Sequence, residues 1–491
     1  MWKEESVERL ERYKKILKDS PLLAEAADEA KAHEALTRQA SSAVGNLLSQ
    51  NETVSNVAYY CLAPALCAYV GWILKEAAKA GVRRLYFLAR DAYFMYETAK
   101  TLCGAFDLSV ECRYLSCSRY SVRIPMYHLD IDEALGYICR GGIDVTMGKI
   151  LNRTGLSEEE KEIVLADLNK SGAAVYEKDD PVPYAELENI KKALKGSASF
   201  IEYLTENSKK AMPLLEGYLV QEGLLDDVPM AFADSGWVGS MQKILNRAVD
   251  HIREKYPEKS AAAKPIEGYY WGLYELPEKV DPENYHCYYF SPGYNMRRKV
   301  YFSNCLFEAV FSAPHGMTMG YKEENGRYIP VYGDISKTRK AFMLESKERF
   351  GNFTGCFVSK VNKRPGGYYT EDPALKQDQK TVYRLLRCFM GEPCRQEAEI
   401  FGRLHFSDDV LDYHNQELAA ALSEEELAAN HAFNKILSMF GIKKGFLKES
   451  AWYEASAVIG GRRVKRHLRG YAGYKRLLYL RKQRSWRKLY G

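Results

Sequence analysis

The fold prediction for this 491-residue chain rests on the sequence VPMAFADSGWVGSMQKIL, residues 228–245. An apolar run reaches the acid Asp234, two glycines follow, and the stretch ends in a segment with helical spacing of its apolar residues. Strand, glycine-bearing turn and helix in this order are typical of parallel sheets, and the N-terminus of such a helix binds anions. The stretch therefore predicts either a phosphate-binding turn or a plain tight connection in which Ser240 caps the helix.

Three other segments extend the same strand-and-helix alternation on both sides of this stretch. Strands are expected at RLYFL (84–88), in VECRYLSCS (110–118) and in IEGYYWGLYEL (266–276), the first followed by a segment with helical spacing. Alternation of this kind predicts an α/β fold in which a parallel, Rossmann-like sheet carries helices on both faces.

The remaining segments predict helical additions to this core. We expect an N-terminal helical segment at 1–55, the α/β core at 56–130 and 217–320, a helical insertion at 131–216, a mixed, mostly helical region at 321–450, and a basic helical tail at 451–491.

The charge of the chain is concentrated at its C-terminus. Residues 461–491 hold twelve Lys or Arg and no acid, so the net charge of +5 leaves about 5 − 12 = −7 for the rest of the chain. A basic tail on an acidic body predicts an anionic partner, either a membrane surface or a nucleic acid. Nucleic acid is the less favoured partner, because the tail offers few stacking aromatics and no recognised binding module.

Cysteine usage and hydropathy favour a reduced cytoplasmic protein. Eleven cysteines occur without a CxxC pair, and their spacing matches no zinc site. The N-terminus is charged from Lys3 onward, unlike a signal peptide. The uncharged run at residues 57–74 is borderline for a membrane span, and with a mean hydropathy of −0.39 for the chain we expect a buried core helix instead.

Candidate site residues follow two predicted strands, because ligands of open α/β sheets bind beyond the carboxyl ends of the strands. In ARDAY, Arg90 and Asp91 form either a surface ion pair or a pyrophosphate site. In ADSGWVGS, Asp234 could accept from sugar hydroxyls or hold a hydrated Mg²⁺ ion. The candidate phosphate-binding residues of this second loop are Ser235, Gly236, Trp237, Gly239 and Ser240.

Further candidates lie after the second strand and in a later apolar helix. Ser118, Arg119 and Arg123 suit phosphate recognition, although a solvated basic edge is an equal alternative. Glu308 lies in an apolar helical segment, where a buried carboxylate needs a partner. His315, between Pro and Gly, fits a loop residue better than a catalyst. The P-loop, dinucleotide and HExxH motifs are missing from the sequence.

The segments RLYFLARDAYFMY, YLSCSRYSVRIP, FADSGWVGSMQ and LFEAVFSAPHG resemble a bacterial family tied to surface-polysaccharide gene clusters. Many members also carry an HAD-type phosphatase domain and are labelled predicted HAD-superfamily hydrolases. The resemblance covers roughly residues 57–320. One departure is Ala92, where the family usually has Gly.

The loop order is similar to that of type I phosphoribosyltransferases. The resemblance implies that ARDAY binds pyrophosphate and that ADSGWVGS binds the 5-phosphate of phosphoribosyl pyrophosphate (PRPP). The usual signature has two acids and a TGGT-like core, whereas this chain has one acid and GWVGS. The implied activity is transfer of a phosphoribosyl or glycosyl group to a glycan acceptor, with Mg²⁺ as cofactor and Asp234, Asp91 and Arg90 as catalytic residues.

The same resemblance implies the setting of the reaction. The glycan acceptor would be lipid-linked, the basic tail would hold the enzyme at the inner face of the plasma membrane, and a separate HAD phosphatase would be a partner.

Two alternatives stay open at this stage. An HAD-like phosphohydrolase needs a strand that ends in DxD, whereas the candidate strand ends here read Asp91-Ala-Tyr93 and Asp234-Ser-Gly236. The other alternative is a non-catalytic scaffold that recruits polysaccharide enzymes to the membrane through its basic tail.

Overall fold

A computed structural model describes residues 2–40, 51–106, 108–141, 145–170, 172, 176–256, 264–363, 372–406, 416–439 and 448–490. Parts of the predicted N-terminal segment (41–50) and of the predicted C-terminal region (407–415 and 440–447) lie outside these ranges.

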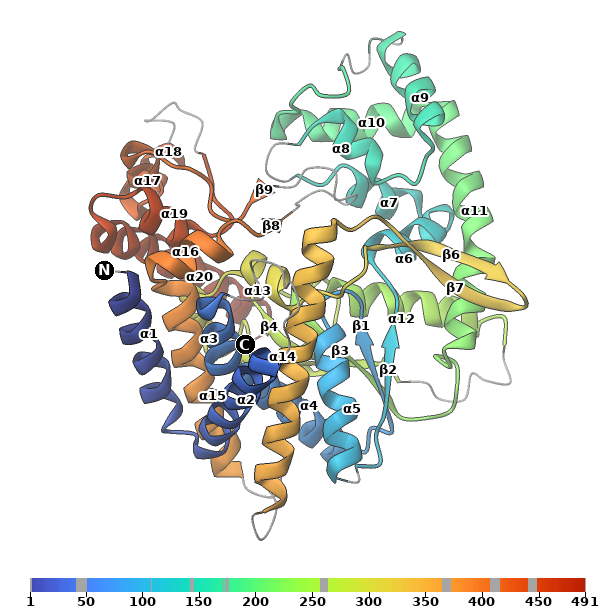
Figure 1. Cartoon of the computed structure of the whole chain (residues 1–491). Coiled ribbons are helices and arrows are strands. Elements are labelled where there is room, and N and C mark those ends of the chain that lie inside the picture. Colours follow the sequence, from blue (N-terminus) through green and yellow to red (C-terminus); the bar gives the residue numbers. More distant parts are fainter. Residues whose placement is uncertain are drawn as a thin grey trace.

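A five-stranded sheet forms the centre of the molecule (Figure 1), and all of its strands are parallel. The strand order is β2-β1-β3-β4-β5, so the chain moves to the other side of β1 when it returns from the insertion between β2 and β3. The α/β class and the parallel sheet are confirmed. The strands are β1 (Arg84–Leu88), β2 (Glu111–Leu115), β3 (Met230–Trp237), β4 (Glu267–Leu273) and β5 (Tyr285–Phe290).

Helices cover both faces of this sheet, which is why every residue of β1 is buried. Leu85 and Phe87 point into one apolar cluster, whereas Tyr86 and Leu88 point into a second cluster on the opposite face. The first face is covered by α4 (Ala63–Lys79), α5 (Tyr93–Phe106), α14 (Lys337–Asn362) and α15 (Asp372–Leu386), and the second by α6 (Arg119–Met126), α11 (Ala198–Gln221) and α12 (Ser240–Arg253).

The apolar run predicted as a core helix lies inside the first cluster. The helices α3 (Glu52–Val57), η1 (Ala58–Leu62) and α4 form one continuous helical segment. Within the described residues this is the one helix long and apolar enough to cross a membrane. Its apolar 18-residue window has a mean hydropathy of 1.6, yet 94% of that window is buried inside the protein. That burial agrees with the predicted core helix.

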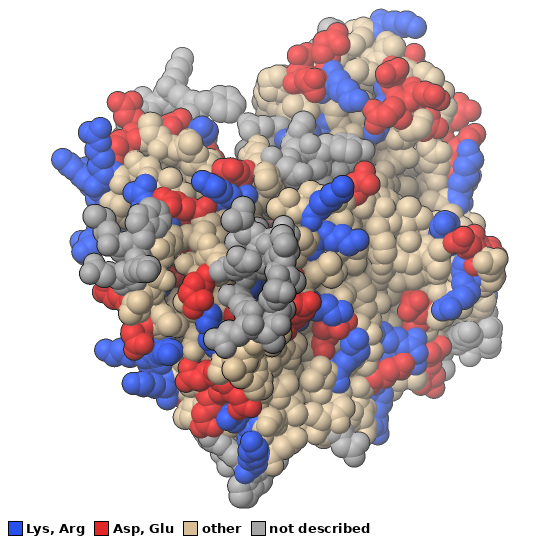
Figure 2. All heavy atoms as spheres, viewed as in Figure 1, with Lys and Arg blue, Asp and Glu red and all other residues tan. Residues whose placement is uncertain are grey.

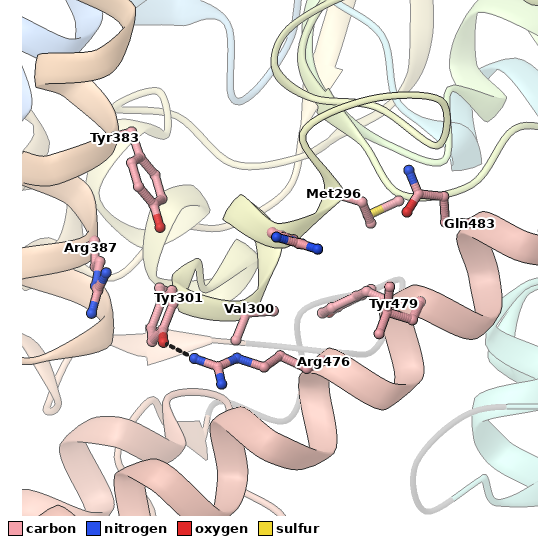
Figure 3. Close-up of a pocket in the computed structure, with 10 residues that line it drawn as sticks. Met296, Val300, Tyr301, Tyr383, Arg387, Arg476, Tyr479 and Gln483 are labelled. Atoms are coloured by element: carbon pink, nitrogen blue, oxygen red, sulfur yellow. Dashed lines mark hydrogen bonds between the residues drawn. The ribbon is translucent and has the colours of Figure 1, made fainter.

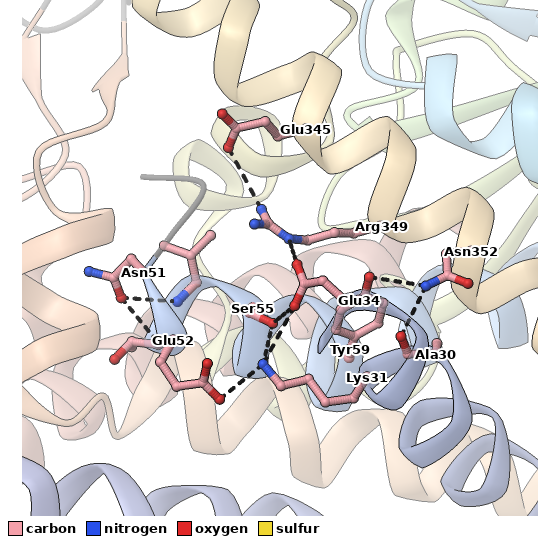
Figure 4. A network of polar contacts seen from close by, with 12 residues as sticks. Ala30, Lys31, Glu34, Asn51, Glu52, Ser55, Tyr59, Glu345, Arg349 and Asn352 are labelled. Atoms are coloured by element: carbon pink, nitrogen blue, oxygen red, sulfur yellow. Dashed lines mark hydrogen bonds and ion pairs between the residues drawn. The ribbon is translucent and has the colours of Figure 1, made fainter. Parts of the chain in front are cut away.

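A buried polar network fastens the N-terminal helix α2 (Pro21–Ala40) to α3 and α14 (Figure 4). Glu34 on α2 accepts a hydrogen bond from Arg349 Nε on α14 at 2.8 Å, and the Ser55 hydroxyl on α3 also donates to it. The Lys31 ammonium group donates to Ser55 in turn. Each charge in this network therefore has a partner, as buried polar groups require.

Two helical lobes extend the sheet on the side toward which β1 and β2 point (Figure 1), and the molecular surface is indented between them (Figure 2). The insertion lobe has an apolar core of its own and contains α7 (Ile131–Ile138), α8 (Met147–Asn152), α9 (Glu158–Lys170) and α10 (Leu187–Gly196). The C-terminal lobe contains α16 (Arg395–Phe401), α17 (Glu424–Ala429), α18 (Ala432–Met439) and α19 (Tyr453–Gly460).

The predicted basic tail at 451–491 contains two helices: α19, which belongs to the C-terminal lobe, and the long helix α20 (Val464–Tyr490), which packs on the body of the protein. Lys475 forms a buried ion pair with Glu454 at 2.7 Å, and Lys482 pairs with Glu275 at 2.6 Å. Part of the tail's positive charge is therefore used inside the protein.

Three features differ from the sequence prediction. β5 was not expected, and a β-hairpin of β6 (Thr318–Glu324) and β7 (Arg327–Tyr332) crosses the boundary predicted at residue 320. α11 continues past the predicted end of the insertion at residue 216.

The other elements are α1 (Trp2–Leu17), η2 (Tyr127–Leu129), η3 (Tyr184–Glu186), η5 (Pro282–Asn284), η6 (Met296–Tyr301), α13 (Asn304–Phe311), η8 (Arg387–Gly391), β8 (His405–Phe406) and β9 (Gln416–Glu417).

The N-terminal helix α1 is held to the C-terminal lobe by a buried ion pair between Arg9 and Glu397, at 2.7 Å. We expect Glu397→Gln to lower the free energy of unfolding by about 3 kcal/mol, because it leaves the buried guanidinium charge uncompensated. Urea denaturation measures the change. The exposed pair of Arg395 and Glu399 supplies the control: Arg395→Ala should cost less than about 0.5 kcal/mol, and an equal loss in both variants would contradict the argument.

Candidate functional site

The carboxyl ends of β1 and β3 bring two predicted acids together. The strands pair in parallel up to Phe87 and Ala233, so the residues that follow them lie at the same edge of the sheet. The Ser235 hydroxyl donates to Asp91 Oδ2 at 3.1 Å and lies 3.5 Å from Asp234 Oδ1. One serine side chain thus joins ARDAY to ADSGWVGS.

Glu308 is the third acid of this group, and it is held by Trp237. The Trp237 indole Nε1 donates to Glu308 Oε1 at 2.6 Å. The indole ring packs 5.5 Å from the rings of both Phe302 and Phe307, which fixes its orientation. The sequence interpretation placed Trp237 among the phosphate-binding residues, whereas in the structure its indole orients a carboxylate.

The three acids interact electrostatically, and their pKa values are raised. Burial is the largest cause for each of them. The pKa of Asp234 is raised to about 7 by burial and then by the charges of Asp91 and Glu308. The pKa of Glu308 is raised to about 7 by burial and by Asp91, while the hydrogen bond from Trp237 acts in the opposite direction. Protein surrounds all three carboxyl groups, although each side chain keeps partial contact with solvent.

Arginines balance this negative charge. Arg90 and Arg119 both lower the pKa of Asp91 and of Glu308, which places their guanidinium groups within charge–charge range of the acids. Arg90 follows a cis peptide bond, and its carbonyl accepts from the Ala313 amide at 3.1 Å. Arg339, in the first turn of α14, also lowers the pKa of Asp91. The sequence did not single out Arg339, and no local motif marks it.

His315 lies beside the cluster with both ring nitrogens engaged. Its Nδ1 lies 2.8 Å from the Gly316 carbonyl, so Nδ1 carries the proton, and Nε2 accepts from the Tyr114 hydroxyl at 2.8 Å. The ring also packs on Tyr332, with centroids 4.2 Å apart. These contacts agree with a positioned loop residue, as the sequence predicted.

The predicted phosphate loop is shorter than expected. Residues 235–237 continue β3 and pair with β4, so only Val238 and Gly239 separate the strand from α12. Gly236 has φ +109°, and a Cβ there would lie 2.7 Å from the Gly272 carbonyl oxygen. This glycine therefore allows the close approach of β4, whereas the sequence interpretation assigned it to a ligand.

The N-terminus of α12 has no side-chain cap. Gly239 is its N-cap in the left-handed conformation, with φ +67°, and supplies no capping side chain. Ser240 is the first residue of the helix, so it does not cap it as the alternative interpretation expected. The first amide groups of α12 lack a side-chain acceptor from this cap.

Two candidates after β2 have structural roles. The Ser118 hydroxyl caps α6 by accepting from the Ser121 amide at 3.0 Å, and it donates to the Thr318 carbonyl at 2.6 Å. Arg123 faces the insertion lobe, with its guanidinium 4.2 Å over the Tyr137 ring and 3.9 Å from Glu133. These contacts hold both side chains in structural roles, and the contacts described for them do not reach the carboxyl cluster. Phosphate binding by Ser118 and Arg123 stays a prediction.

An all-protein metal cage is not found: within the described ranges, no group of three or more His, Cys, Asp or Glu side chains is arranged to hold an ion. Asp91 and Asp234, joined by Ser235, offer two carboxylates at one edge. Mg²⁺ is usually held by one or two carboxylates together with substrate phosphates and water. The donor set fits a magnesium ion of that kind.

Comparison with known proteins does not extend these observations, because no family model and no curated protein sequence matches the chain.

The raised pKa of Asp234 predicts how stability depends on pH. The folded protein binds a proton here more tightly than the unfolded chain does, so the contribution of Asp234 to the free energy of unfolding should fall as the pH rises from about 4 to about 7. We expect Asp234→Asn to flatten this fall and to raise the melting temperature at pH 8 more than at pH 4. The exposed Asp227 provides the control variant Asp227→Asn. If the stability of wild type and of Asp234→Asn depended on pH in the same way, the raised pKa of Asp234 would be refuted.

Proposed function

We propose that this protein is a transferase of bacterial surface-polysaccharide biosynthesis, which moves a phosphoribosyl or glycosyl group from an activated phosphosugar to a glycan acceptor. The observation that carries the proposal is the Ser235 hydroxyl between Asp91 and Asp234, because it joins the two loops of the phosphoribosyltransferase-like order at one sheet edge. Glu308, held by Trp237, completes the cluster.

The charges of the cluster suit a phosphorylated sugar. Arg90 and Arg119 would bind the pyrophosphate oxygens, with Arg339 as an additional cation. The uncapped amide groups at the start of α12 would bind the terminal phosphate, in place of the longer loop expected from the sequence. Asp234 would accept hydrogen bonds from the ribose hydroxyls between these two ends.

In the reaction, the bond between the anomeric carbon and the pyrophosphate oxygen breaks, and an acceptor hydroxyl oxygen bonds to that carbon from the opposite face. The Asp234 carboxylate stabilises the positive charge that develops on the sugar ring. Glu308 takes the proton of the acceptor hydroxyl, a role for which its pKa of about 7 is suited. When bound between Asp91 and Asp234, Mg²⁺ would supply charge neutralisation for the leaving pyrophosphate.

The convergence of acids and arginines favours a ligand site over a purely structural scaffold. A scaffold needs no buried carboxylates with raised pKa values, whereas such groups cluster at functional sites. The phosphohydrolase alternative gains no support from the strand ends, where a second acid two residues after Asp91 or Asp234 is missing.

Binding of the donor is the first test. In calorimetry with Mg²⁺ we expect wild-type protein to bind PRPP, and Arg90→Gln to weaken the binding about tenfold or more through loss of charge-assisted hydrogen bonds. Arg83→Gln removes an exposed arginine at the opposite end of β1 and should have no effect. A nucleotide sugar bound in place of PRPP would overturn the donor assignment alone. Phosphate release from a sugar phosphate, abolished by Asp234→Asn without PRPP binding, would favour the hydrolase.

The role of Trp237 gives a second test. Trp237→Phe keeps an aromatic ring but removes the donor to Glu308, so the pKa of Glu308 should rise further. We expect the acidic limb of the pH–rate profile for transfer to move to higher pH, with a loss of about tenfold in rate near neutral pH. The control is Trp72→Phe on α4. It makes the same Trp-to-Phe substitution at a residue that stacks on Tyr69. An unchanged pH profile in Trp237→Phe would contradict the positioning role.

A further inference from the structure

A cavity of about 380 Å³ lies between η6, the junction of α15 with η8, and the middle of α20 (Figure 3). Its volume is in the range of small-molecule sites. The side chains that the argument uses are Arg297 and Tyr301 from η6, Tyr383 from α15, Arg387 from η8, and Arg476 and Tyr479 from α20.

The lining of this cavity is cationic. Its described lining residues include three arginines and no carboxylate. Arg387 shares Glu392 with Arg12 at 3.0 and 2.6 Å, which offsets part of its charge. Arg297 and Arg476 form no ion pair with any acid in the part of the chain that the structure describes. Their charges are therefore available to an anion, because oppositely charged side chains do not neutralise them.

The same lining is aromatic and apolar. The Arg387 guanidinium lies 4.4 Å over the Tyr301 ring, and Arg476 donates to the Tyr301 hydroxyl at 2.7 Å. Contact with Tyr301 therefore holds Arg387 and Arg476 in place, although these two arginines come from helical elements far apart in the sequence. Met296 and Leu480 add apolar surface. A bare inorganic anion would satisfy the arginines but leave this surface uncovered, whereas an organic anion covers both.

We propose that this cavity binds a phosphate monoester attached to a flat or apolar group, either as a free metabolite or as the headgroup of a lipid. Arg297 and Arg476 bind the phosphate oxygens, and the tyrosine rings pack on the organic part. The inference goes beyond the proposed transferase reaction and does not depend on it.

The cavity is separate from the carboxyl cluster. The ammonium group of buried Lys299 lies 5.7 Å from the Tyr479 ring and 5.5 Å from the Phe302 ring, and Phe302 packs on Trp237. A layer of packed side chains therefore lies between the cavity and Glu308. The two sites can be tested independently.

The probes are phenyl phosphate, inorganic phosphate, and vesicles of phosphatidylcholine with or without phosphatidic acid, measured with the full chain at about 150 mM salt. We expect saturable binding of phenyl phosphate that is tighter than that of inorganic phosphate. Arg297→Gln and Arg476→Gln should each weaken it about tenfold. Arg481→Gln removes an exposed charge from the same helix α20 and should change binding less than twofold.

Each outcome decides the proposal. Binding only to phosphatidic-acid vesicles, lost in Arg297→Gln and Arg476→Gln but kept in Arg481→Gln, supports the site and assigns the ligand to a lipid headgroup. Equal losses in all three variants show that diffuse positive charge binds the probe, and they overturn the proposal, as does the absence of saturable binding. Because Arg297 is exposed, its variant tests the site even if Arg476→Gln destabilises α20. Asp234→Asn should leave phenyl phosphate binding unchanged, which separates this result from the transferase proposal.

Discussion

The hydrogen bonds of Ser235 depend on one constraint, the parallel register of β1 and β3. Phe87 and Ala233 lie side by side, so both chains leave the sheet at the same edge and Asp91 comes within reach of the Ser235 hydroxyl. A slip of one residue in β3 would turn its side chains to the opposite face and separate the two acids. The buried apolar residues of both strands fix the register, and thus the core of the protein sets the geometry of the candidate site.

This geometry has an energetic cost. Burial raises the pKa values of Asp91, Asp234 and Glu308, so each charged form is disfavoured in the folded protein. Arg90 and Arg119 offset part of the repulsion, and a bound cation or sugar hydroxyls would offset more. Destabilising carboxyl groups kept together at a strand edge are typical of a site that is built for a ligand, because a purely structural core would gain by replacing them.

Much of the fold could be predicted because the apolar strands and the turn residues carry local signals. β1 was predicted with its observed ends, and the acids at 91, 234 and 308 were selected from their places after strands or in an apolar helix. The hairpin of β6 and β7 was missed although Asn325 and Gly326, both with positive φ, form the Asn-Gly signal of a tight hairpin.

The features that the sequence did not predict depend on contacts between residues far apart in the chain. Arg339 reaches the cluster from α14, more than a hundred residues after Asp234 and with no motif of its own. Nor could the sequence show that Gly236 packs against β4, since the neighbour of β3 is set by the sheet order. Ser118 and Arg123 stand in a promising pattern, yet a helix cap and an aromatic ring occupy their side chains.

We propose that Asp91, Asp234 and Glu308 form one ligand site with the arginines around them. Crystals grown with PRPP and Mn²⁺ in place of Mg²⁺ test it most directly, because anomalous scattering locates the ion without assumptions about its ligands. We expect an anomalous peak at the carboxylates of Asp91 and Asp234, with the pyrophosphate beside Arg90 and the terminal phosphate at the start of α12. An ion and a donor bound elsewhere, with the carboxyl cluster empty, would contradict it.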